Sequence, residues 1–331
     1  MNSKTYRVTL ETLGPVHIGT GSTLTKQEFI LEEAKRLIHI IDGRRLVNYL
    51  KRIELLEDYV AFCRNPEPQS GLGFFKKCAI ERDEWEYFIR YSVPVVYDEK
   101  QKVNVVSPFM RDGLQAAYVP GSSLKGLIRT ILFGERRDRE TNETMSRIRF
   151  SDSEPIADSK LAVYQKIDIS NKIKPIPFFR ESIDVNETID TYLTIEDDVI
   201  SIKELERQIV QFFHHYKTKW MLGFKTTEAG AHFFEQDDPL TQTILENNAP
   251  IIVLGGGSGI AAKTIHYQQY DRETEKRELF QLLQRCSRNI YGKLDIMPRN
   301  VPMALKLTKH YEKDWWLMQG VCKISFERME R

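Results

Sequence analysis

A glycine-rich run near residue 255 is the segment whose residue types most clearly suggest chemistry. It follows the apolar stretch 250–254 and comprises Gly255, Gly256, Gly257, Ser258 and Gly259. Because glycine has no Cβ atom, the main-chain N–H groups of such a loop can approach an anion closely, and phosphate is the natural ligand. The run therefore predicts contact with an RNA backbone, with a purely structural glycine turn as the alternative.

The same run is close to a nucleotide-binding P-loop, which opens an enzymatic alternative. Residues 257–264 match the pattern G-x-x-x-x-G-K-[ST] except at Ala262, which replaces the second glycine, and Lys263 takes the lysine position. The alanine falls where the backbone of a P-loop lies against the phosphates. No convincing strand that ends in a magnesium-binding carboxylate follows it. A P-loop-like NTPase is therefore the less favoured interpretation of this run.

A second segment of small residues, 120–129, predicts the start of a helix. Either serine can cap this helix, and hydroxyl groups, amides and an ammonium group would converge there on a phosphate. Lys125 and Arg129 are four residues apart, so they share a helix face and could follow an RNA backbone. The alternative is an ordinary helix start with a solvated basic face. The candidate RNA-binding residues here are Gly121, Ser122, Ser123, Lys125 and Arg129.

His17 is the candidate acid-base residue, because it lies in a glycine-rich segment with Gly19 and Gly21. An endoribonuclease could use it as a general base. No lysine or tyrosine nearby in the sequence completes an acid-base pair, so a loop-fixing or RNA-contacting histidine is the favoured interpretation. A further candidate surface is the run 285–310, where six basic residues and one acidic residue surround Tyr291, which could stack on a base.

Composition restricts the function classes. The 331 residues carry 48 lysines and arginines against 47 aspartates and glutamates, so any polyanion site must be a local patch. No apolar run reaches the roughly 20 residues of a membrane span, and the first residues do not resemble a signal peptide. The four cysteines show no metal-ligand spacing. We expect a cytoplasmic protein without membrane contact, metal or cofactor.

Strand and helix patterns alternate along the chain, which predicts an α+β fold. Gly134–Arg149 is charged and predicts a mobile link. Ser201–Glu204 forms a capping box that predicts a helix. Strands are expected near residues 6–10, 29–31, 37–41, 93–97, 103–106, 162–169, 178–183, 188–195, 250–254, 303–307 and 317–326, and a helical pattern runs from 46 to 60.

The pattern is compatible with two ferredoxin-like (RRM-like) units with helical insertions. The first would span residues 1–150, with a helical insertion at about 44–92. The second would span residues 151–331 and carry the glycine-rich loop.

The motifs resemble the RAMP (repeat-associated mysterious protein) subunits of CRISPR effector complexes. The likeness lies in segments 14–21, 40–46 and 119–129, and it continues through 179–183, 254–263, 297–299 and 320–324. These segments span most of the chain and occur in the order expected for the family. Among RAMP subunits, the length and the closing motifs are most similar to the family of fifth subunits in type III-A Csm complexes.

That resemblance implies a non-catalytic, RRM-like subunit that binds guide RNA (crRNA). It would cap the backbone filament at the 3′ end of the guide, contact the neighbouring backbone RAMP subunit and other Csm subunits, and take part in guide maturation and antiviral defence. By the same resemblance, the segments around Gly121 and Gly255, with Arg129 and Lys263, would face the guide or support the loops that do. A RAMP endoribonuclease that processes repeat RNA with His17 is the rival from the enzyme class.

Overall fold

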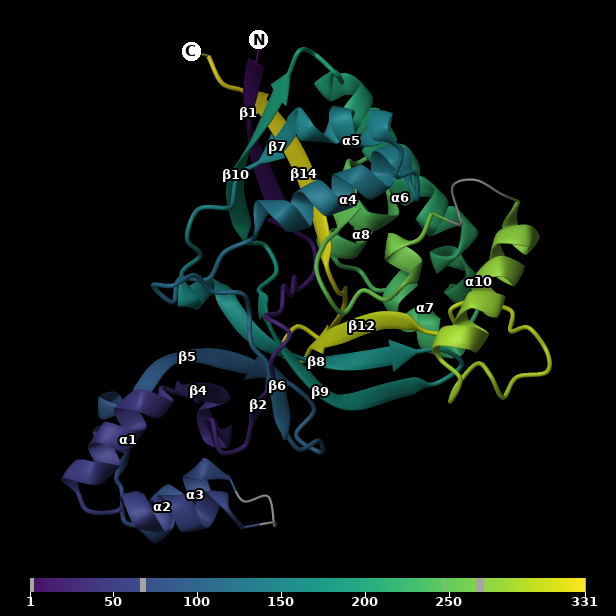
Figure 1. Cartoon of the computed structure of the whole chain (residues 1–331). Helices are drawn as coiled ribbons and strands as arrows, with labels where there is room; N and C mark the ends of the chain where they lie inside the picture. Colours follow the sequence, from purple (N-terminus) through teal and green to yellow (C-terminus); the bar gives the residue numbers. More distant parts are fainter. Residues whose placement is uncertain (1–2, 66–69, 247, 266–270, 331) are drawn as a thin grey trace.

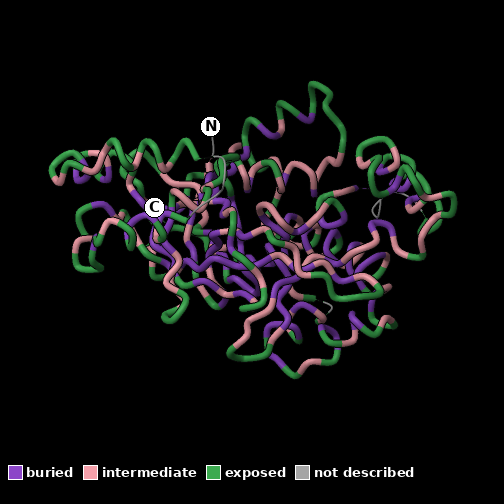
Figure 2. The backbone as a smooth tube through the Cα atoms, turned by 90° about the horizontal axis from the view of Figure 1, so that it is seen from below, coloured by how far each residue is buried: buried purple, intermediate pink, exposed green. Residues whose placement is uncertain are grey.

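The computed structural model describes residues 3–65, 70–246, 248–265 and 271–330. These residues form two β-sheets with helices packed against them, which confirms the expected mixed α/β structure (Figure 1). Figure 2 shows the buried backbone concentrated in the interior, with the exposed stretches at peripheral turns and loops. No helix in these ranges is both long enough and apolar enough to cross a membrane.

The smaller sheet joins the two ends of the chain. Its order is β11-β14-β1-β10-β7, and every neighbouring pair is antiparallel. Val8 and Leu10 in β1 are fully buried, as their alternation with Arg7 and Thr9 predicts. The strands are β1 (Ser3–Thr12), β7 (Ile148–Phe150), β10 (Thr188–Glu196), β11 (Ile251–Val253) and β14 (Val321–Arg328).

Three helices pack on this sheet. Helix α4 (Gly121–Phe133) contacts β7, and α6 (Ile202–Lys219) contacts β11 and α4. Ser201 caps α6 as expected, because its Oγ accepts the Glu204 N–H at 3.2 Å. The third helix, α5 (Arg139–Ser146), occupies the segment for which a mobile link was predicted, so that prediction is wrong; Asp138 caps it.

The larger sheet has the order β2-β6-β9-β8-β5-β4-β3, and β12 pairs with both β8 and β13. Its pairs are antiparallel except β5 with β8 and β6 with β9, which are parallel. Both sheets take strands from each side of residue 150, and the two-unit division stays a prediction. The strands are β2 (Leu24–Thr25), β3 (Phe29–Glu32), β4 (Leu37–Ile41), β5 (Ile89–Val96), β6 (Val105–Ser107), β8 (Leu161–Ile169), β9 (Ile173–Ile183), β12 (Leu305–His310) and β13 (Trp315–Met318).

A helical lobe with its own apolar core projects beside β4 and β5, at the lower left of Figure 1. The helix expected from 46 to 60 is two helices, because the chain turns at Glu54, whose φ is +60°. The lobe contains α1 (Gly43–Arg52), α2 (Leu56–Cys63), α3 (Gly71–Lys77) and the 3-10 segment η2 (Arg82–Tyr87).

The last strand expected near 317–326 is also two strands. A turn at Gly320, with φ of +83°, separates β13 from β14 and sends them to different sheets. The remaining elements are η1 (Glu33–Lys35), η3 (Asp158–Lys160), η4 (Met221–Phe224), α7 (Glu228–Phe234), α8 (Pro239–Leu245), η5 (Ala261–Lys263) and α10 (Arg272–Cys286).

Candidate nucleic-acid interface

The glycine-rich loop after β11 needs glycine for two reasons. Gly255, Gly257 and Gly259 have φ values of +76°, +93° and +82°, a left-handed backbone that other residues rarely adopt. There is also no space for side chains: a Cβ atom at Gly255 would lie 2.1 Å from the carbonyl oxygen of His17. The loop is therefore pressed against the segment that carries His17.

Most main-chain donors of this loop remain available for a ligand. The Gly256 N–H donates to the His17 carbonyl oxygen at 2.6 Å. Within the described ranges, no protein acceptor engages the N–H groups of Gly255, Gly257, Ser258 or Gly259. Successive N–H groups of this kind can form an anion-binding concavity, and anion binding by this loop stays a prediction.

His17 lies beneath the loop rather than beside an open surface. It is 6% exposed, and its Nδ1 lies 2.6 Å from the carbonyl oxygen of Glu181, so this nitrogen carries the proton and donates it. A Cβ atom at Gly19 would lie 2.6 Å from His17 Nε2, so that residue must be small. Burial, with a contribution from Arg180, lowers the pKa of His17 to about 4. Gly21, in contrast, is exposed with open space around it.

The start of α4 differs from the sequence prediction. Neither Ser122 nor Ser123 caps the helix; the N-cap is Pro120, and Asp152 Oδ1 accepts the Gly121 N–H at 2.8 Å. A Cβ atom at Gly121 would lie 2.4 Å from the carbonyl oxygen of Phe150. Gly121 thus allows α4 to approach the segment after β7, and its N–H group is already occupied.

The α4 start and the glycine-rich loop nevertheless meet, as their chemistry predicts. They line one cleft of about 260 Å³, which places Ser123 and Gly126 of α4 opposite Gly255 and Lys263. Lys263 turns its ammonium group back to donate to the Gly255 carbonyl oxygen. Two segments more than a hundred residues apart therefore form one surface.

The two basic residues of α4 have different surroundings. Lys125 is half-buried and has no hydrogen-bond or ion-pair partner within the described part of the chain. The Arg129 guanidinium instead donates to the Arg136 carbonyl oxygen at 3.0 Å and to Asn142 Oδ1 at 3.3 Å. Lys125 can therefore bind a ligand, whereas Arg129 holds the connection between α4 and α5.

Arg180 and Lys306 adjoin the glycine-rich loop, and Lys166 is linked to Lys306 through a shared carboxylate. Arg180 Nη1 would lie 3.2 Å from a Cβ atom at Gly257 and is buried without a hydrogen-bond partner in the residues described, while the guanidinium lies 4.6 Å from the centroid of the Phe178 ring. Lys166 and Lys306 share the carboxylate of Asp168, at 3.3 and 2.8 Å. Only the basic character of the run 285–310, which contains Lys306, could have indicated this cluster.

The cations of this cluster outnumber the carboxylates that contact them. Burial lowers the pKa of Lys166, and repulsion by Lys306 adds to the shift; burial also lowers the pKa of Arg180. Burial disfavours the charged form of each group while Asp168 favours it, and an anion bound nearby would favour it further. Arg180, Lys263 and Lys306 lie beside the loop, and Lys166 is linked to Lys306 through Asp168, so the four cations form a local basic patch.

The P-loop interpretation does not fit this geometry. Ala261–Lys263 form a single 3-10 turn instead of the start of an α-helix, and residues 266–270 lie outside the described ranges. The lysine ammonium group contacts a loop carbonyl rather than pointing across a free nest of amides. Tyr291 is not an open stacking platform either, because it is only 7% exposed.

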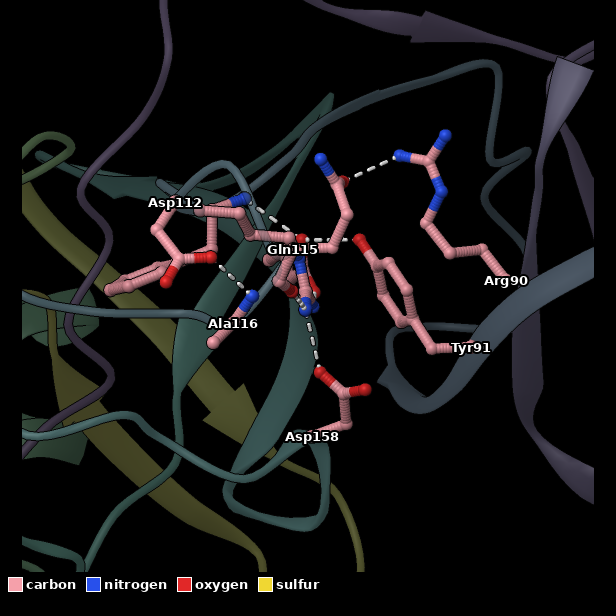
Figure 3. Close-up of polar contacts among 9 residues, drawn as sticks. Arg90, Tyr91, Asp112, Gln115, Ala116 and Asp158 are labelled. Atoms are coloured by element: carbon pink, nitrogen blue, oxygen red, sulfur yellow. Dashed lines mark hydrogen bonds and ion pairs between the residues drawn. The ribbon is translucent and has the colours of Figure 1, made fainter. Parts of the chain in front are cut away.

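A buried ion-pair network includes Glu181, the residue whose carbonyl accepts from His17, and Figure 3 shows Tyr91 and Asp158 as part of it. The Arg111 guanidinium contacts Glu181 Oε1 and Asp158 Oδ1, each at 2.7 Å, and lies 3.7 Å from the centroid of the Tyr91 ring. Glu181 Oε2 accepts the Tyr91 hydroxyl at 3.0 Å and the Phe109 N–H at 2.8 Å. The residue whose carbonyl holds His17 is thus fixed at both its main chain and its side chain.

Comparisons with known proteins agree with this arrangement. The model of the RAMP superfamily matches residues 9–228. The CRISPR system Cms protein Csm5 of Enterococcus italicus is 35% identical over 347 aligned positions that cover 99% of each chain. The chain belongs to the Csm5 family of RAMP proteins. A Streptococcus thermophilus Csm5 is 29% identical over 83% of each chain.

Two solved structures share the fold of this Csm5-family chain. One is a chain of the cryo-EM structure of a Csm–crRNA–target RNA ternary complex from a type III-A CRISPR-Cas system. It has a TM-score of 0.73, and the match covers 97% of this chain and 100% of that one. The other is the crystal structure of T. onnurineus Csm5, with a TM-score of 0.63 and coverage of 81% and 96%. Both are 19% identical in sequence, so they support the fold alone.

Proposed function

We propose that this Csm5-family protein is a subunit of a cytoplasmic type III-A Csm effector complex that binds the guide RNA. It caps the backbone filament at the 3′ end of the guide, next to a backbone RAMP subunit, and takes part in guide maturation and antiviral defence. The names of its relatives and the complex in which its fold occurs support this placement.

The observation that carries the RNA-binding proposal is the meeting of α4 with the glycine-rich loop. Both line one cleft, and Gly257 and Gly259 of the loop lie beside the side chains of Arg180 and Lys306. Main-chain donors and cations recognise phosphates without reading bases. We therefore expect the RNA backbone to lie across Ser123, Lys125, the loop and Lys263, while His17, Gly19 and Gly121 position these groups. For Gly21, Ser122 and Arg129, a direct contact stays a prediction.

The strand order supports a ferredoxin-like unit as part of this proposal. In chain order, β1, α4, β7, β10, α6 and β14 form a βαββαβ series, and β14-β1-β10-β7 are neighbours in one sheet. This unit takes its first and last strands from opposite ends of the chain. A second such unit in the larger sheet, and the division into 1–150 and 151–331, remain proposals.

We further propose that the subunit does not cleave RNA. His17, the candidate general base, is only 6% exposed, and one of its ring nitrogens is bonded to the Glu181 carbonyl. A general base must reach the proton that it removes. Labelled repeat RNA incubated with the protein without metal should stay intact; cleavage that is lost in His17→Ala would establish the nuclease instead.

Retention of guide RNA on the purified full-length chain, measured over a series of salt concentrations, tests the RNA-binding proposal. The wild type should bind with an affinity that falls steeply with salt, because phosphate contacts release counterions. Lys125→Ala with Lys263→Ala should weaken binding and lower the salt slope by about two, about one for each phosphate contact. Lys51→Ala with Lys77→Ala, at exposed sites in the helical lobe, is the matched control.

If the wild type does not retain guide RNA at low salt, the RNA-binding proposal is wrong. An equal loss of thermal stability and binding in the double variant would assign the two lysines to structure.

A further inference from the structure

A second cavity, of about 550 Å³, adjoins the glycine-rich loop at Ser258–Ala261. Its other walls come from β8, η4, the end of α10 and the segment 287–304. A cavity of this volume falls in the range of small-ligand sites, roughly 300–1,000 Å³. It is therefore large enough for one nucleobase with its ribose.

The walls of this cavity combine apolar faces with buried polar atoms. Tyr291 and Pro302 contribute apolar surface, and the Tyr291 hydroxyl oxygen accepts the Met303 N–H at 2.9 Å. Ser258 is only 2% exposed, and its Oγ has no hydrogen-bond partner among the described residues. A buried hydroxyl without a partner calls for an explanation, and a ligand with a polar edge supplies one.

The charge of the walls is predominantly positive. Lys174, Arg299 and Lys306 line the cavity, against the single carboxylate of Asp168. The side chain of Lys306 also passes beside the loop, because its Cγ would lie 3.1 Å from a Cβ atom at Gly259. Its ammonium group can therefore reach a phosphate on the loop while its stem borders the cavity.

We propose that this cavity receives one unstacked nucleobase of an RNA strand whose backbone lies on the glycine-rich loop. This inference rests on the proposed RNA-binding function and adds a base-binding site to it. The apolar walls cover the faces of the base, Ser258 Oγ bonds to its polar edge, and Lys306 holds the adjoining phosphate. Proteins recognise single-stranded RNA by this combination of burial and edge contacts.

A cavity-filling variant separates base binding from backbone binding. Ala304 is half-buried and lines the cavity, so Ala304→Phe should block it; Ala61→Phe, at an exposed site in α2, is the matched control. Each protein is titrated with two oligomers of equal length and charge, an oligouridylate and its fully abasic analogue. Ala304→Phe should weaken oligouridylate binding about five- to tenfold, the order expected for one lost base contact, and leave abasic binding unchanged.

Two outcomes of the titration overturn the proposal. One is an equal loss for both oligomers, which would make the effect one of the backbone or the fold. The other is no loss for either oligomer in a folded variant. If the wild type binds neither oligomer at low salt, the proposed function fails first, so the two failures are distinguishable.

Photocrosslinking of the wild type keeps the proposal testable if Ala304→Phe does not fold. An oligomer that carries 4-thiouridine should crosslink to the tryptic segment that contains Met303, and millimolar UMP should not displace it, since the tethered base is held at a high effective concentration. Absence of that crosslink, or its complete displacement by UMP, would overturn a strand-borne base. The second result would assign the cavity to a free nucleotide.

Discussion

Arg111 is paired with Glu181, whereas Arg180, the residue before Glu181 in the chain, faces the glycine-rich loop, and this contrast separates a structural charge from a proposed RNA-binding charge. Although burial opposes its charge, the carboxylates of Glu181 and Asp158 and the neighbouring Tyr91 raise the pKa of Arg111. Arg180 precedes Glu181 on β9, yet its Nη1 faces the glycine-rich loop without a partner and burial lowers its pKa. A buried cation that is paired with two carboxylates supports the fold, whereas a buried cation that has a free hydrogen-bond donor can bind an anion.

The largest expected effect is on the paired arginine. Arg111→Met should lower the free energy of unfolding by about 3–5 kcal/mol, because it leaves the Glu181 carboxylate buried without its cation. Chemical denaturation measures this, with Arg180→Met as the matched control. A loss below about 1 kcal/mol in Arg111→Met would show that the network is not a structural support.

A second prediction concerns His17, which donates to the carbonyl oxygen of Glu181, the partner of Arg111, and whose pKa is affected by Arg180. The pKa of His17 is lowered to about 4 in the folded protein against about 6.5 when unfolded, so protonation favours the unfolded state. Stability should fall by about 3 kcal/mol as the pH drops from 6.5 to 4. His17→Gln should remove most of this slope and leave the smaller part due to His39, whose pKa burial also lowers. Identical slopes in both proteins would contradict a buried neutral His17.

The third prediction concerns Arg180, whose Nη1 has no hydrogen-bond partner among the described residues. Arg180→Met should weaken guide RNA binding about tenfold, as expected for one lost charge-assisted contact, and change the free energy of unfolding by less than about 1 kcal/mol. Binding is measured by fluorescence anisotropy at fixed salt. A loss of stability as large as that of Arg111→Met would erase the distinction between the two residues.

The smallest effects are expected at two glycines, one in the glycine-rich loop and one in α4. Gly257→Ala should cost about 1–2 kcal/mol, because its φ is +93° and the new Cβ would lie 2.4 Å from Gln319 Oε1. Gly126→Ala, on α4 with open space around it, should raise stability by about 0.5–1 kcal/mol. Thermal denaturation compares the two; equal shifts of the same sign would show that the loop backbone is not constrained.

The elements that the sequence predicted correctly are those whose signals are local. The alternation of Val8 and Leu10 marked β1, and Ser201 with Glu204 marked the start of α6. The glycine-rich loop was recognisable for the same reason, since its conformation depends on residues next to each other. Local patterns of this kind need no knowledge of the rest of the fold.

What the sequence did not reveal depends on residues distant in the chain. Asp152, rather than a neighbouring serine, satisfies the Gly121 N–H. Arg180 and Lys306 reach the loop only because β9, β8 and β12 are joined in one sheet. The separation of β13 from β14 likewise follows from their membership of different sheets. Pairing between distant strands has no local pattern in the sequence.

The pairing of β1 with β14 has a consequence for how the protein is made. Tyr6 is opposite Arg328 and Thr12 is opposite Cys322, so one edge of β1 stays open until β14 has left the ribosome. Loop closure over nearly the full chain is entropically slow. During synthesis the growing chain thus carries an unpaired strand edge, a template for association with other chains. Its yield in the cell should depend on how long that edge is shielded.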